Sequence, residues 1–224
     1  MNTQKDISEI KLAIWFEDNR EDPISVTIKE YKEFVKEKEQ KKIANFIYHR
    51  LYDRYLKPFQ YDEAKYKKQY KKQYKNGFSI MANCCLLIEA LQSFKNGWED
   101  TNERGKSEKA FKHFFAEESN FSDLKSTDFY KNVRCGILHQ GETTGGWKIT
   151  RTNTNGEGTT TQETEGIFNS EQLVINAEIF MRKMNTALEN YKKELETSEW
   201  DSEIWDNCRT KMRKIISNCE SATK

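Results

Sequence analysis

The stretch DFYKNVRCGILHQG, residues 128–141, organises the fold and function expected of this chain. As a helix it has an apolar stripe at four-residue steps, which predicts burial of Phe129, Val133 and Ile137. Arg134 and His139 lie about 140° apart on an ideal helix. They can still converge, because arginine is long and Gly136 between them loosens the last turn. Gly141 stands where a left-handed cap would end the helix.

The composition favours helices over sheets. Hydrophobic residues make up 36% of the chain and charged residues 33%, with Lys and Glu interleaved, which suits amphipathic helices better than a sandwich or a parallel sheet. Aromatic residues reach 12%, enough to build a thin core. We therefore expect an all-α helical bundle forming a single domain over residues 1–224. Helices this charged often complete their burial against a second copy, so we also expect a homodimer.

Charge and cysteine usage bear on location and cofactors. The net charge of +1 gives the whole protein no general attraction to nucleic acid or membrane. The five cysteines have no zinc-site spacing, which favours reduced thiols in a cytoplasmic protein. We find no signal peptide or membrane span in the sequence, no phosphate-binding glycine loop, and only three histidines. We therefore expect no metal and no cofactor.

Hydrophobic periodicity and turn residues predict the order of the elements. They are a strand or short helix at 9–16, a long helix from Ser25 or Thr27 to Pro58, a central buried helix at 77–96, a short helix at 107–117, the 128–141 helix capped by Ser126 or Thr127, a helix at 170–195, and a C-terminal accessory helix within 200–219.

The segment 141–166 is rich in Thr, Gly and Asn. Residues 147–152 alternate as a strand would, and residues 159–161 could pair back on them through a turn at Asn155-Gly156. A small β-hairpin or a flexible loop insertion is the expectation, because loops of this length in compact domains tend to be functional or disordered.

A duplicated YKKQ in residues 61–76 brings tyrosines and lysines onto one segment. One interpretation is a surface that contacts RNA phosphates through its basic side chains. The residues concerned are Lys67, Lys68, Lys71, Lys72 and Lys75. The other interpretation is a surface helix whose tyrosines pack inward while its lysines stay solvated.

Glu89 interrupts the apolar segment 77–96. A carboxylate in such surroundings needs a partner or a functional reason. Asn83 is the other polar candidate in this segment, whereas Cys84 and Cys85 suit the role of small buried hydrophobic residues.

The run Arg134-Cys-Gly-Ile-Leu-His139, near the end of a helix in an all-α bundle, resembles the signature of the HEPN superfamily (higher eukaryotes and prokaryotes nucleotide-binding). The resemblance covers residues 77–191, about half the chain, and implies an up-down helical core over residues 77–195 that dimerises with its Arg–His pairs facing each other. Many members are metal-independent endoribonucleases of bacterial toxin–antitoxin, abortive-infection or CRISPR-type defence systems. The resemblance also implies RNA as substrate and an antitoxin or regulatory protein as a partner.

By this resemblance Arg134 and His139 form the catalytic pair, supported by a polar residue on the earlier helix, Glu89 or Asn83. Asn132, on a mostly polar stripe with His139, completes the candidate catalytic set. The chain departs from the pattern in having cysteine directly after the arginine and no tyrosine two positions after the histidine.

The chemistry of such a pair is coherent. A neutral imidazole can take the proton of a ribose 2′-hydroxyl near neutral pH. An arginine stays charged and stabilises the pentacovalent transition state, and the attack leaves a 2′,3′-cyclic phosphate. DNA lacks the 2′-hydroxyl and would be spared.

Three other interpretations stay open. Arg134 and His139 can simply be cations favoured at a helix C-terminus. Cys135 and His139, four residues apart, can form a thiolate–imidazole pair. The third is a non-catalytic HEPN-like module that binds nucleotide, RNA or a protein partner.

Overall fold

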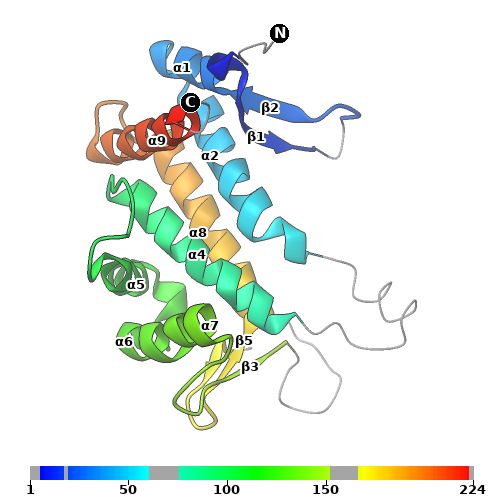
Figure 1. Cartoon of the computed structure of the whole chain (residues 1–224), viewed down its shortest axis with the longest axis vertical. Helices are drawn as coiled ribbons and strands as arrows, with labels where there is room; N and C mark the ends of the chain where they lie inside the picture. Colours follow the sequence, from blue (N-terminus) through cyan, green and yellow to red (C-terminus); the bar gives the residue numbers. More distant parts are fainter. Residues whose placement is uncertain (1–5, 18–19, 61–75, 152–165, 222–224) are drawn as a thin grey trace. The chain divides into compact units, whose positions relative to one another are not determined.

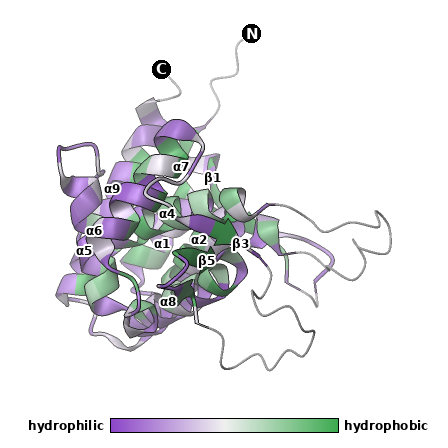
Figure 2. Ribbon diagram, turned by 90° about the horizontal axis from the view of Figure 1, so that it is seen from below, coloured by the Kyte–Doolittle hydropathy of each residue, from purple (hydrophilic) through white to green (hydrophobic). Residues whose placement is uncertain are grey.

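The computed structural model describes residues 6–17, 20–60, 76–151 and 166–221, and in these ranges the chain is mostly helical with a few short strands (Figure 1). Figure 2 shows hydrophilic and hydrophobic residues alternating along the helices, as expected for amphipathic elements. The chain divides into two compact units. Unit 1 comprises Met1–Arg54, Ala90–Thr101 and Leu188–Lys224, and unit 2 comprises Tyr55–Glu89 and Asn102–Ala187. The expectation of a single domain stays a prediction.

In unit 1, the open choice at residues 9–16 is settled as a strand. β1 (Lys11–Trp15) pairs antiparallel with β2 (Ile24–Thr27) (Figure 1). Thr27 then caps α1 (Ile28–Lys36) through a capping box, in which its hydroxyl accepts from the Glu30 N–H at 3.2 Å and Glu30 Oε2 accepts from the Thr27 N–H at 2.8 Å. Of the two caps considered, Thr27 is confirmed.

The prediction of one long helix up to Pro58 is wrong in its middle. α1 ends at Lys36, and α2 (Gln40–Tyr55) begins only after a turn. In that turn Lys38 has φ +55°, and the Glu39 N–H donates to the Phe34 carbonyl at 2.9 Å. This is the six-to-one hydrogen bond of a Schellman ending, here with a lysine at the left-handed position that glycine usually occupies.

The last helix, α9 (Glu203–Ser221), confirms the predicted C-terminal helix and completes unit 1. Its buried stripe is Trp205, Cys208, Met212 and Ile216, at three- and four-residue steps. The Trp205 indole donates to the Leu195 carbonyl at 3.0 Å, and the Asn207 amide donates to the Lys95 carbonyl at 2.7 Å. These bonds tie α9 to the unit 1 parts of two further helices, α4 (Gly77–Lys95) and α8 (Ala177–Thr197).

Unit 2 contains the remainder of α4 and α8 together with α5 (Lys106–Glu117), α6 (Ser126–Phe129) and α7 (Cys135–Gln140). Its core is a cluster of phenylalanine rings with centroids 4.9 to 5.9 Å apart, typical of favourable aromatic pairs. The rings are Phe111, Phe114, Phe115, Phe121, Phe129 and Phe180.

Three short strands of unit 2 form a sheet in the order β3-β5-β4. β3 (Lys148–Thr150) confirms the strand predicted at 147–152, but it pairs in parallel with β5 (Val174–Asn176), and β4 (Phe168–Asn169) pairs antiparallel with β5. The predicted partner at 159–161 and the turn at 155–156 lie outside the described residues.

The prediction that a helix begins at residue 170 is also wrong, because α8 begins at Ala177. Leu173 has φ +53° and the next three residues form β5, the central strand of the sheet. Asn176 then caps α8, its side-chain oxygen accepting from the N–H groups of Glu178 at 3.1 Å and Ile179 at 3.2 Å. The hydrophobic residues directly before residue 177 therefore belong to strand β5 and not to the helix.

α4 is the one described helix that is long and apolar enough to cross a membrane, with 61% of the relevant window buried inside the protein. Most of its apolar residues are buried core positions, as predicted, including Ile80, Met81, Cys84, Cys85, Leu87 and Ile88, whereas Phe78 and Leu86 are exposed. This burial is consistent with a soluble protein.

Candidate functional site

The 128–141 segment is helical from Asp128 to Gln140, but its middle is a π-helical turn, Tyr130–Arg134, between α6 and α7. The Cys135 N–H donates to the Tyr130 carbonyl, five residues back. Phe129, Val133 and Ile137 are buried, which confirms the predicted apolar stripe. π-helical turns occur frequently at functional sites.

The predicted caps of this segment are wrong at one end and right at the other. Ser126 is already helical, and the preceding Lys125 occupies the N-cap position without a side-chain hydrogen bond. Gly141 has φ +74° and its N–H donates to the Ile137 carbonyl at 3.1 Å, so it ends α7 as expected.

Glu89 of α4 holds the guanidinium of Arg134. Glu89 Oε1 accepts from Arg134 Nε at 2.9 Å and lies 2.8 Å from Nη2. The two side chains are only 12% and 15% exposed, so the pair is largely shielded from water. Burial disfavours the charged guanidinium, but the Glu89 charge and hydrogen bond outweigh it and raise the pKa of Arg134. The carboxylate that looked out of place in an apolar helix thus has a partner.

Arg134 also reaches His139, as predicted. Arg134 Nη1 lies 3.3 Å from His139 Nε2, and His139 is exposed. A guanidinium can only donate, so this contact requires a neutral imidazole with its proton on Nδ1 and the Nε2 lone pair facing the arginine. The ring of Tyr130, four residues before Arg134, lies 5.5 Å from the guanidinium carbon, within cation–π range.

Gly136 makes room for the loop that follows α7, while a loosening of the last turn stays a prediction. The chain after α7 folds back over Gly136, where an added Cβ would lie 2.4 Å from the Glu142 carbonyl oxygen and 3.2 Å from Thr143 Cα. The glycine therefore allows backbone to lie directly against the helix, between the positions of the arginine and the histidine.

Asn132 holds the loop after α7 in place. Its backbone carbonyl accepts from the Thr144 N–H at 2.9 Å, and its side-chain oxygen accepts from the Thr144 hydroxyl at 3.1 Å. Gly145, with φ +62°, lies so close that an added Cβ would be 2.6 Å from Asn132 Oδ1. The contacts observed for this predicted catalytic residue are thus with the loop after α7.

The remaining candidate residues do not contact the Arg134–His139 pair or lie outside the described residues. Asn83 donates its amide to the Ser79 carbonyl of its own helix at 2.9 Å, so Glu89 is the residue of α4 that contacts the arginine. Burial raises the pKa of Cys85 well above its ordinary value, which fits its predicted role as a small buried hydrophobic residue. The predicted RNA-binding lysines, Lys67, Lys68, Lys71, Lys72 and Lys75, lie outside the described residues.

Sequence reasoning missed two participants, Tyr130 beneath the arginine and Thr144 on the loop. The four-residue step from Tyr130 to Arg134 is a signal that could have found the first, because such neighbours meet on one helix face. Thr144 is twelve residues from Asn132, and the sequence carries no periodic signal for such a contact. Within the described ranges, no group of three or more His, Cys, Asp or Glu side chains is arranged to hold a metal ion.

No family model, curated protein or solved structure matches this chain. Its function is therefore inferred from the side chains of the site.

Proposed function

We propose that this chain is a HEPN-like, metal-independent endoribonuclease of a bacterial defence or toxin–antitoxin system, acting in the cytoplasm as a homodimer, with Arg134 and His139 as its catalytic pair. The observation that carries the proposal is the 3.3 Å approach of Arg134 Nη1 to His139 Nε2, with the imidazole exposed to solvent. A cation that cannot lose its proton and a base that can accept one thus meet where a substrate can reach them.

Glu89 makes this pair suited to act on a phosphodiester. It takes Nε and Nη2 of the guanidinium, which leaves Nη1 directed toward the imidazole. A guanidinium held on one side is preorganised, so little reorganisation is needed when negative charge develops on a phosphate beside it. Glu89 is in this scheme a positioning residue.

The reaction follows from these placements. An RNA phosphate oxygen replaces His139 as the acceptor of Arg134 Nη1, which releases the Nε2 lone pair to take the proton of the neighbouring 2′-hydroxyl. The 2′-oxygen attacks phosphorus, the bond from phosphorus to the 5′-oxygen breaks, and the 5′-oxygen is protonated from solvent or by the imidazolium. The products are a 2′,3′-cyclic phosphate and a 5′-hydroxyl, and Arg134 stabilises the charge of the pentacovalent transition state.

A second candidate is a non-catalytic HEPN-like module that binds nucleotide, RNA or a protein partner. The observation that favours it is the Glu89–Arg134 ion pair itself, because a largely buried and neutralised arginine also suits a purely structural role. His139 would then be a favoured polar residue in the last turn of α7.

Cleavage of RNA in the presence of EDTA separates the two candidates. Wild-type protein is incubated with single-stranded and structured RNA and with the matching DNA, and the product ends are identified. We expect RNA products ending in 2′,3′-cyclic phosphate, no DNA cleavage, and loss of at least about a hundredfold in rate for His139→Ala and for Arg134→Ala.

Matched variants control for loss of a histidine or an arginine elsewhere in unit 2. His113→Ala on α5 and Arg182→Ala on α8, the latter at an exposed position, should cleave like the wild type. RNA binding without cleavage by folded wild-type protein would favour the binding module, and cleavage that survives both site variants would rule out this pair as the catalytic residues.

A further inference from the structure

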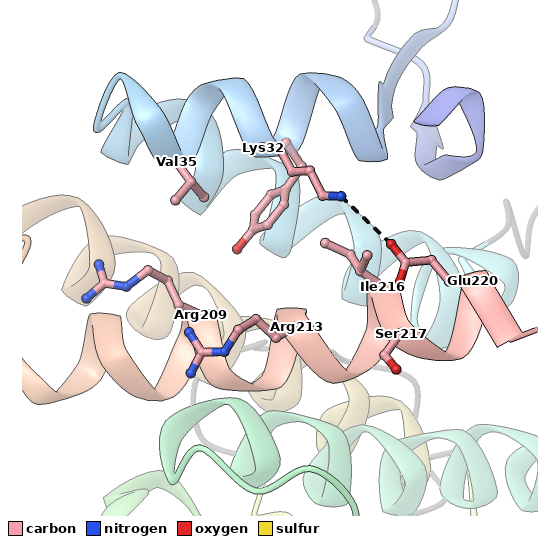
Figure 3. A pocket seen from close by; sticks show the side chains of 8 residues that line it. Lys32, Val35, Arg209, Arg213, Ile216, Ser217 and Glu220 are labelled. Atoms are coloured by element: carbon pink, nitrogen blue, oxygen red, sulfur yellow. Dashed lines mark ion pairs between the residues drawn. The ribbon is translucent and has the colours of Figure 1, made fainter. Parts of the chain in front are cut away.

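A groove in unit 1 lies between α1 and α9 and has a volume of about 290 Å³ (Figure 3). This is near the lower end of the range for small-molecule sites, which are concave and mostly apolar with a few convergent polar groups. Its lining is mostly apolar and is supplied by Tyr31 and Val35 of α1 and Ile216 of α9.

Cationic side chains line the same groove. Arg209 and Arg213 extend along α9 in the same direction, while Ile216 and Glu220 point toward α1 (Figure 3). The charges of both arginines act on the Tyr31 phenol, lowering its pKa against the larger opposing effect of burial, which raises it. The guanidinium groups are therefore close to the apolar surface.

The cations of the groove differ in whether a carboxylate already pairs with them, and only an unpaired one can bind an anionic ligand. Arg209 is paired with Asp206 and donates to the Trp200 carbonyl at 2.9 Å. Lys32 lies 3.8 Å from Glu220 at the end of the groove. Arg213 donates to the hydroxyl of Thr210 at 2.7 Å, and among the described side chains no carboxylate lies within ion-pair distance of it.

We propose that this groove binds a small amphiphilic anion, an aliphatic or aromatic carboxylate whose apolar part lies against Tyr31, Val35 and Ile216 and whose carboxylate pairs with Arg213. The apolar lining of the groove favours a hydrocarbon chain, because binding removes apolar surface of both the ligand and the protein from water. The guanidinium selects the anion, because it can donate two parallel hydrogen bonds to a carboxylate. This site is independent of the ribonuclease proposal.

Octanoate is a suitable probe, with octanol and octylamine as neutral and cationic counterparts of the same chain. Binding to the full-length protein is measured by isothermal titration calorimetry. We expect saturable binding of one octanoate per chain, and binding of octanol and octylamine at least about tenfold weaker, since one charge-assisted contact is lost in each.

Variants assign the site. Arg213→Gln should weaken octanoate binding about tenfold, and Arg213→Lys should retain part of it, because lysine keeps the charge without the fork. Lys36→Gln, an equal charge change at an exposed α1 position outside the groove, should bind like the wild type. Val35→Phe fills the groove and should abolish binding while circular dichroism stays unchanged.

Three results would overturn the proposal: no saturable octanoate binding, equal affinity for octanol, or unchanged affinity in Arg213→Gln. Analytical ultracentrifugation of the wild type and the variants, with and without octanoate, measures whether the chain self-associates through the groove. Self-association that Val35→Phe disrupts and octanoate leaves unaffected would mean that a second copy of the chain occupies the groove instead.

Discussion

His139 of unit 2 and His49 of unit 1 show how differently one residue type can be used within a chain. His49, on α2, stacks flat on Trp15, with ring centroids 4.7 Å apart, and its Nδ1 lies 3.2 Å from Asp53 Oδ2. His139 is exposed, and its Nε2 faces the guanidinium of Arg134. An aromatic neighbour and a carboxylate fix the first ring in place, whereas the second ring meets a cation at an open surface.

The difference lies in what each ring can still do. One face of the His49 ring is covered by Trp15, and its side chain is only 18% exposed, so a substrate has little access to it. The partner of His139 is an arginine, a group that can bind phosphate, so a phosphate oxygen could replace the imidazole as its hydrogen-bond acceptor. Access and the charge of the facing partner, more than the histidine itself, therefore mark the candidate site.

The largest expected effect comes from breaking the ion pair behind His139. Glu89→Ala leaves the guanidinium of Arg134 largely buried without its carboxylate, so we expect the free energy of unfolding to fall by about 3 kcal/mol. The counterpart beside His49, Asp53→Ala, leaves behind an imidazole whose pKa is lowered by burial and not a permanent cation, so it should cost less, about 1 kcal/mol. Urea denaturation followed by circular dichroism measures both.

Glu89→Gln sharpens this test because it keeps an oxygen acceptor and removes only the charge. The decrease in its free energy of unfolding should lie between those of Glu89→Ala and Asp53→Ala. If Glu89→Ala costs no more than Asp53→Ala, the arginine is not anchored by Glu89, and the preorganisation argued for the His139 site is lost.

The parts of the fold that follow from local rules were predicted from the sequence. The stripe Phe129, Val133 and Ile137 is buried because its spacing matches one helix face, and Thr27 caps α1 because a hydroxyl at that position meets the freed N–H of Glu30. The approach of Arg134 to His139 was also predicted, although the π-helical turn before it has no recognisable sequence signal.

The missed features depend on tertiary context or on unusual residues at turns. α1 ends with a lysine, Lys38, in the left-handed conformation that glycine usually adopts. Because no glycine stands there, the sequence gives no signal for the break between α1 and α2. Residues 174–176 have hydrophobic spacing compatible with a helix, but pairing with two strands holds them in β5. Contacts of Asn132 and Gly136 with the loop cannot be read from periodicity, because the loop is placed by the fold.

At Gly136, helix propensity and packing predict opposite effects of an alanine substitution on the free energy of unfolding. Alanine is favoured over glycine in a helix by about 1 kcal/mol, so propensity alone predicts a more stable protein. A Cβ at 2.4 Å from the Glu142 carbonyl forces the loop away from the helix that carries His139, and we expect Gly136→Ala to destabilise by about 2 kcal/mol.

Gly166→Ala is the control, because its added Cβ would meet the nearest backbone at an ordinary 3.6 Å. It should change the free energy of unfolding by less than about 0.5 kcal/mol. A stabilised Gly136→Ala protein would mean that the loop does not rest on the helix.

The smallest expected effect is the pH dependence that His49 gives to stability. Burial lowers the pKa of His49 below its ordinary value of 6.5, against the opposing hydrogen bond and charge of Asp53, with Lys192 lowering it further and Glu17 raising it. Between the two pKa values the unfolded chain binds more protons, so the stabilisation is present above pH 6.5 and is lost as the pH falls below it.

The free energy of unfolding, measured from about pH 7.5 down to about pH 5, should therefore fall less in His49→Gln than in the wild type. Asp53→Asn removes the two effects of Asp53 that raise this pKa, so its stability should fall more steeply on acidification. A steeper fall in His49→Gln would show that the folded protein raises the pKa of this ring, and the contrast between a packed imidazole and an exposed one would then have to be abandoned.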